Sequence, residues 1–92
     1  MPGSNASPDQ QMATDAAVQD AAAHLGVNPG DLRVDHVEQR QWADSSLGCP
    51  RPGIMYSQIV TPGFLILLSA GSNRQLEYHS DGRGRVVLCK ES

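Results

Sequence analysis

The chain has 92 residues, of which 39% are hydrophobic and 4% aromatic, and ten acidic against seven basic side chains give a net charge of −3. This length accommodates one hydrophobic core, which must be small and mostly aliphatic because aromatic residues are scarce. The charge disfavours nucleic-acid binding, which needs clustered cations, because Lys90 is the single lysine and the arginines are scattered. No apolar run reaches the length of about 18 residues that a membrane-spanning helix needs.

The N-terminal part of the chain predicts a short lead followed by a helix. We expect residues 1–7 to be a disordered lead and residues 8–92 to form a single domain. Ser7, Pro8 and Gln10 have the spacing of a helix start with a capping box, and Thr14-Asp15 offers a second possible start. Gly26 suits a helix C-cap. One apolar stripe runs along this alanine-rich segment, formed by Val18, Ala21, Ala22 and Leu25. A stripe of such small side chains favours close packing on a flat partner, such as a sheet.

The remainder reads as a series of strands separated by turns. Five segments have the composition of strands: Leu32–Trp42, Met55–Val60, Phe64–Leu68, residues 75–79 and Arg85–Cys89. In the first, Val37 has the opposite parity to Leu32 and Val34, so either a bulge lies near His36 or both faces of the strand are partly covered. Tight turns are predicted at residues 28–31, 71–73 and 81–84, and at Thr61–Gly63 with Pro62 and Gly63 as its central residues. His79 is expected on the polar face of its strand. One helix followed by four or five antiparallel strands is an α+β fold in two layers.

Between the first two predicted strands lies a loop rich in proline and glycine, which runs from Trp42 to Gly53. A disulfide between Cys49 in this loop and Cys89 near the C-terminus would stabilise the fold by up to about 4 kcal/mol. Pairing is the favoured interpretation, and it would indicate a secreted or cell-envelope protein. Two buried, reduced thiols in a cytoplasmic protein are the alternative. The first residues lack the pattern of a signal peptide, which leaves a cytoplasmic protein or one whose leader has been removed.

The candidate chemical groups do not have the spacing of a catalytic or metal site. The possible soft metal ligands have no recurrent ligand spacing: Cys49, Cys89, His24, His36 and His79. Cys49 as a nucleophile is disfavoured because Pro50 follows it, so no helix begins there to activate the thiol. Asp44 to Ser46 are expected to shape the loop through local hydrogen bonds rather than to hydrolyse a substrate. We therefore predict no metal, no cofactor and no enzymatic activity.

Several short motifs resemble those of a family of small uncharacterised bacterial domains, over roughly residues 30–89. They are Trp42-x-Asp-Ser-Ser-Leu-Gly-Cys-Pro-x-Pro-Gly, Tyr56-x-Gln58, Thr61-Pro62-Gly63, Tyr78-His79 and Val87-Leu88-Cys89. The resemblance implies a unit with two linked cysteines and no catalytic role. A looser similarity, of shape alone, is to small peptidase-inhibitor modules, and a shared fold does not establish a shared function.

The leading hypothesis from the sequence is a protein-binding module that presents Leu47–Ile54 as a rigid loop. Arg51, between Pro50 and Pro52, is expected to be the most exposed contact and to suit a trypsin-like pocket. Trp42 is expected to pack beneath the loop, with an exposed anchor for a partner as its alternative role.

A second hypothesis from the sequence is a structural or accessory domain in which the loop only plugs one end of the sheet. An enzyme ranks third, because so small a domain has little volume to enclose a pocket. The oligomeric state stays open, since Met55–Val60 or Arg85–Cys89 could be an edge strand that pairs with a second copy.

Overall fold

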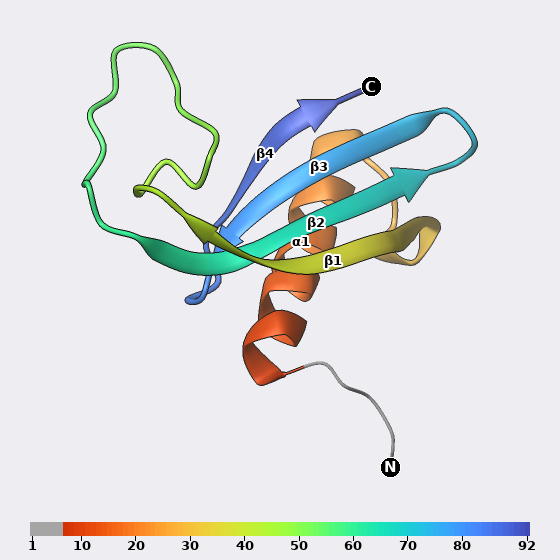
Figure 1. Ribbon diagram of the computed structural model, residues 1–92. Coiled ribbons are helices and arrows are strands. Elements are labelled where there is room, and N and C mark those ends of the chain that lie inside the picture. The colour runs from red at the N-terminus through yellow and green to blue at the C-terminus, as the bar shows by residue number, and fades with distance from the viewer. Residues whose placement is uncertain (1–6) are drawn as a thin grey trace.

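The computed structural model describes residues 7–92, so the predicted disordered lead lies outside the described residues except for Ser7. One helix, α1 (Pro8–Leu25), packs on one face of a sheet built from β1 (Leu32–Trp42), β2 (Thr61–Ala70), β3 (Arg74–Asp81) and β4 (Val86–Glu91), as Figure 1 shows. The sheet has four antiparallel strands in the order β1-β2-β3-β4, and a short 3-10 helix (Pro29–Asp31) joins α1 to β1. The two-layer α+β prediction is confirmed, with four strands.

Helix α1 begins at the first of the two starts that the sequence offers and ends at the predicted C-cap. The Ser7 hydroxyl accepts a hydrogen bond from the Gln10 N–H at 3.1 Å, and Gly26 is the C-cap. The buried face consists of Ala13, Ala17, Ala21 and Ala22, and Val18 and Leu25 pack beside it. Alanine side chains let the helix axis approach the sheet closely. Of the residues described, no helical segment combines the length and the apolar character that crossing a membrane requires.

The sheet buries side chains on both of its faces. Beneath α1 lies the main core, to which the sheet contributes Phe64, Ile66, Leu68, Leu76 and Tyr78. A second, smaller cluster lies on the opposite face and contains Trp42, Leu47 and Leu65. Because β2 contributes to both clusters, its uninterrupted apolar run is explained, and the prediction of a central strand covered on each side is confirmed.

A bulge interrupts the pairing of β1 with β2. The register shifts between Val34 and His36, so that Asp35 has no direct partner in β2. Of the two explanations that the sequence offers for the parity of Val37, the bulge near His36 is the one confirmed. The bulge returns Val37 to the helix side, opposite Ile66, where it packs against the main core.

Two local predictions are wrong. Met55–Val60 is not a strand, because β1 pairs directly with β2 and this segment belongs to the connection between them. Pro62 and Gly63 do not form a turn, because both lie in β2, opposite Gln41 and Arg40. Pro62 is tolerated there since β3 pairs with β2 only from Gly63 onward, so no strand on that side needs its missing N–H.

Gly63 is required by the close approach of β2 to β3, which generates a test of the fold. A Cβ atom at this position would overlap the carbonyl oxygen of Ser80, whereas a Cβ at Gly30 would meet nothing. We expect Gly63→Ala to lower the free energy of unfolding by about 2–3 kcal/mol, because the strand backbones must separate. Chemical denaturation measures the difference, and Gly30→Ala is the matched control. Equal stability of the two variants would contradict this packing.

Candidate functional site

The connection between β1 and β2, residues 43–60, projects beyond the end of the sheet (Figure 1) and is here called the β1–β2 loop. Two hydrogen bonds close its neck. The Ser45 N–H donates to the Ser57 carbonyl at 3.0 Å, and the Ser57 N–H donates to the Ser45 hydroxyl at 2.9 Å. Arg85, immediately before β4, donates a side-chain hydrogen bond to the Ser45 carbonyl. The loop therefore leaves and re-enters the sheet through a defined constriction.

The tip of the loop is a tight turn from Arg51 to Ile54. The Ile54 N–H donates to the Arg51 carbonyl at 3.3 Å, and Gly53 has a φ of 80°. Proline followed by a glycine with positive φ is the sequence that a type II turn requires. The Tyr56 hydroxyl accepts the Arg51 N–H at 3.0 Å and ties the two sides of the turn together. Arg51 is exposed on this ordered tip, in agreement with its expected exposure.

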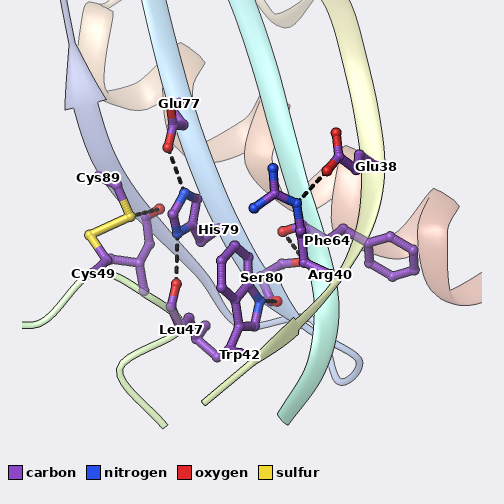
Figure 2. Close-up of polar contacts among 11 residues, drawn as sticks. Glu38, Arg40, Trp42, Leu47, Cys49, Phe64, Glu77, His79, Ser80 and Cys89 are labelled. Atoms are coloured by element: carbon purple, nitrogen blue, oxygen red, sulfur yellow. Dashed lines mark hydrogen bonds and ion pairs between the residues drawn. A yellow bond between two sulfur atoms is a disulfide. The ribbon is translucent and has the colours of Figure 1, made fainter. Parts of the chain in front are cut away.

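A disulfide fastens the loop to the last strand. Cys49 in the loop is bonded to Cys89 in β4, with 5.7 Å between the two Cα atoms, and no cysteine of the chain is free. The bond joins residues that are 40 positions apart, so it restricts a long segment of the unfolded chain. Figure 2 shows this bond between Cys49 and Cys89.

Leu47 is the side chain that seats the loop on the sheet. It is completely buried and packs with Trp42 and Leu65, with Leu67 and Val87 at the margin. Its φ of 59° lies in the left-handed region, which costs a non-glycine residue about 1–2 kcal/mol. Burial of a leucine side chain offsets that cost, since it contributes about 2 kcal/mol or more. Leu47 was expected to contact a partner, but its side chain is not at the surface.

Trp42 lies beneath the loop and holds it from the sheet side. Its indole N–H donates to the Ser80 carbonyl at 2.9 Å, and only 6% of the residue is exposed. The backbone of Gly48 passes so close that a Cβ atom there would lie 2.9 Å from the indole ring. Trp42 therefore packs beneath the loop and is not available as an exposed anchor.

His79 is the buried polar residue that sequence reasoning missed. Its ring stacks on Trp42 with 4.3 Å between ring centroids and 13° between planes, and 6% of the residue is exposed. Nδ1 lies 2.6 Å from the Leu47 carbonyl oxygen and Nε2 lies 2.7 Å from a Glu77 carboxylate oxygen (Figure 2). Both partners accept hydrogen bonds, so a ring with a proton on each nitrogen donates to both. The alternation of β3 places His79 on the polar face, as predicted, but the loop covers that face here.

Local hydrogen bonds around Asp44 shape the start of the loop, as the sequence indicates. The Asp44 carboxylate accepts from the Ser46 hydroxyl at 2.5 Å and from the Ser46 N–H at 2.9 Å. These hydrogen bonds lower the pKa of the Asp44 carboxyl. Among residues 7–92, no three His, Cys, Asp or Glu side chains gather in an arrangement that could hold a metal ion.

Beyond the loop, the same sheet face carries an exposed charged group on β1. His36 and Arg40 both bond the Glu38 carboxylate, and the hydrogen bond from His36, followed by that from Arg40, lowers the pKa of Glu38. This pair of contacts is open to solvent, in contrast to the buried pair of His79 and Glu77. It adds a solvated polar strip next to the loop.

The outer side of the loop exposes large apolar side chains. The exposed fractions are 95% for Met55, 66% for Ile59, 59% for Val60 and 53% for Ile54. The sequence analysis missed this surface because it assigned Met55–Val60 to a strand, where half of these side chains would be covered. The sequence does contain one indication of this exposure, because the apolar segment Met55–Val60 directly follows the proline- and glycine-rich loop that contains Cys49.

Comparison with known proteins identifies a family but no activity. A family model described as Domain of unknown function (DUF8738) matches residues 14–89, which include most of α1, the β1–β2 loop and both cysteines. Neither the curated proteins nor the solved structures contain a match to the chain. The match agrees with the resemblance to a small uncharacterised domain.

The buried hydrogen bonds of His79 predict a specific loss of stability. In His79→Phe the aromatic stack on Trp42 is kept, but the Leu47 carbonyl and the Glu77 carboxylate lose their donor. We expect the free energy of unfolding to fall by about 2–3 kcal/mol in denaturant titrations. His36→Phe is the matched control, because His36 has the same spacing to a glutamate but is solvent-exposed, and should change little. Similar losses in both variants would contradict the buried arrangement.

The disulfide can be checked by chemical modification. After alkylation without reductant, we expect Cys49 and Cys89 to stay unmodified and to appear as one linked peptide in mass spectrometry. The double variant Cys49→Ser/Cys89→Ser should lose up to about 4 kcal/mol of stability, because the unfolded chain regains the entropy of the open loop. Complete alkylation of both thiols in protein purified without reductant would show that the bond is absent.

Proposed function

The chain belongs to the family described as Domain of unknown function (DUF8738), and we propose that it is a non-catalytic protein-binding module whose β1–β2 loop contacts the partner. The observation that carries this proposal is the exposure of apolar side chains on an anchored loop. Met55 is 95% exposed, and Ile59 and Val60 are each more than half exposed. Isolated exposed apolar residues are ordinary, but several on one short segment indicate a contact surface.

The anchoring of the loop favours binding because it reduces the entropy lost on association. The disulfide, the buried Leu47 and the neck between Ser45 and Ser57 already order the segment that carries the apolar side chains. A partner would therefore not have to order the backbone of the loop, and more of the contact energy would appear as affinity.

Arg51 supplies a specificity contact in this proposal. It is exposed at the first position of the tip turn, and in residues 7–92 no carboxylate lies within ion-pair distance of its guanidinium. The peptidase-inhibitor version of the proposal is the weaker one, because the Arg51 carbonyl is held inside a turn by the Ile54 N–H. The test of that version is inhibition of trypsin with Arg51→Ala as control. No inhibition by the parent protein would end that version alone.

A structural or accessory domain is the second candidate function. The burial of Leu47, Trp42 and His79 favours it, because these residues make the loop a plug over one end of the sheet. In this alternative, changes at Met55 and Ile59 would alter neither stability nor any association.

The disulfide is compatible with an oxidising environment outside the cytoplasm. We therefore extend the proposal to a secreted or cell-envelope location, where glutathione and thioredoxin do not reduce such bonds. A fusion to a reporter that is active on only one side of the membrane would test this location.

The proposed binding can be tested by photo-crosslinking. One variant carries the crosslinking residue in place of Met55, and the matched control carries it in place of Gln19, which is exposed on α1. In extracts of the native organism, we expect a defined protein adduct from position 55 that is missing from position 19. Adding Ile59→Ser should reduce the adduct severalfold without changing stability, because an exposed apolar contact is lost. Identical adducts from both positions, or no effect of Ile59→Ser, would contradict a role for the apolar surface.

A further inference from the structure

Strand β4 is an edge of the sheet, and a groove of about 450 Å³ runs beside it. One wall is the loop, which contributes Arg51, Ile54 and Tyr56, and the other includes Asp20 of α1. The floor consists of Arg85 and of Val86–Leu88 in β4. This groove, here called the β4 groove, therefore lies where the helix layer and the loop layer leave the sheet edge uncovered.

The backbone of β4 offers unpaired hydrogen-bonding groups to this groove. Residues of an antiparallel strand alternate between those bonded to the neighbouring strand and those whose N–H and C=O point away from it. The Asp81 N–H donates to the Arg85 carbonyl at 3.1 Å, which assigns Arg85 to the bonded set. Val87, opposite His79, then belongs to the same set, and Val86 and Leu88 direct their backbone groups outward. An edge of this kind can receive a further strand.

The charges that line the groove favour an acidic guest. Arg51 and Arg85 contribute two guanidinium groups, and in residues 7–92 neither lies within ion-pair distance of a carboxylate. Asp20 opposes them, but its carboxylate accepts a hydrogen bond from the Tyr78 hydroxyl at 2.7 Å. Burial, and then this hydrogen bond, raises the pKa of the Tyr78 phenol, so it remains a donor. A guanidinium group can bind a carboxylate through two parallel N–H···O hydrogen bonds, which is a bidentate and directional contact.

We propose that the β4 groove binds an extended segment of a partner protein that carries an aspartate or glutamate side chain and pairs with β4 as an added strand. The main-chain hydrogen bonds of Val86 and Leu88 would supply affinity, and Arg51 and Arg85 would select the acidic side chain. The disulfide holds the loop wall in place, so the groove exists before the segment arrives. This site goes beyond the apolar surface of the proposed function and does not depend on Met55 or Ile59.

The experiment is a selection of displayed random short peptides on the intact, oxidised protein, followed by NMR of the ¹⁵N-labelled chain. We expect enriched peptides to contain Asp or Glu and to shift the amide resonances of Val86 and Leu88. Arg51→Gln/Arg85→Gln should weaken their binding about tenfold or more, because both charge contacts are lost. Arg83→Gln, in the adjacent hairpin turn, is the matched control and should have no effect. N-methylation of the peptide backbone should also abolish binding.

Several results would overturn the proposal. The first is that the protein enriches no peptides beyond those that the Arg51→Gln/Arg85→Gln variant enriches. The second is that the enriched peptides shift amide resonances of residues outside β4. The third is that peptides with an N-methylated backbone still bind. A concentration-dependent dimer whose formation shifts Val86 and Leu88 would assign the edge to a second copy instead. Met55→Ser/Ile59→Ser should leave peptide binding unchanged, so a failure of the proposed function and a failure of this inference are distinguishable.

Discussion

The contact of Leu47 with Trp42 and His79 is the interaction on which the rest of the loop depends. The β1–β2 loop has few backbone hydrogen bonds of its own, so burial of one leucine and the adjacent disulfide must hold it against the sheet. His79 adds a polar link, because the same ring bonds the Leu47 carbonyl and the Glu77 carboxylate. Such a buried polar group stabilises only when both of its nitrogens are satisfied, which makes the geometry demanding.

This anchoring separates two roles within one loop. On the inner side, Leu47 belongs to the second cluster and Cys49 is bonded to Cys89 in β4. On the outer side, the Met55 and Ile59 side chains are not part of the core and form the exposed apolar surface. The sheet edge at β4 lies between this loop and Asp20 of α1, which line the same groove. The same packing thus creates both surfaces for which binding is proposed.

Two Pro-Gly pairs in this chain adopt different structures, so the local sequence alone does not predict a turn at both. Pro52-Gly53 forms the type II turn at the tip of the loop, whereas Pro62-Gly63 continues into β2. The local chemistry of the two pairs is the same, so composition alone assigned a turn to the second pair as well. What distinguishes them is the neighbouring strand, since Gly63 lies against the Ser80 carbonyl, where a side chain has no room. Only a contact between residues distant in the chain carries that information.

The sequence by itself determined the C-terminal end of α1, the central strand and the antiparallel arrangement of the strands, because caps, periodicity and turns act over a few residues. It left the start of α1 and the bulge near His36 as one of two alternatives each, and it placed one strand too many between β1 and β2. It also favoured a link between Cys49 and Cys89. The tertiary structure alone decided which parts of the sheet are covered. The burial of His79 and the exposure of Met55–Val60 both follow from where the loop folds back, and that position depends on long-range packing. An alternating pattern shows which face a side chain occupies, but not whether another segment covers that face.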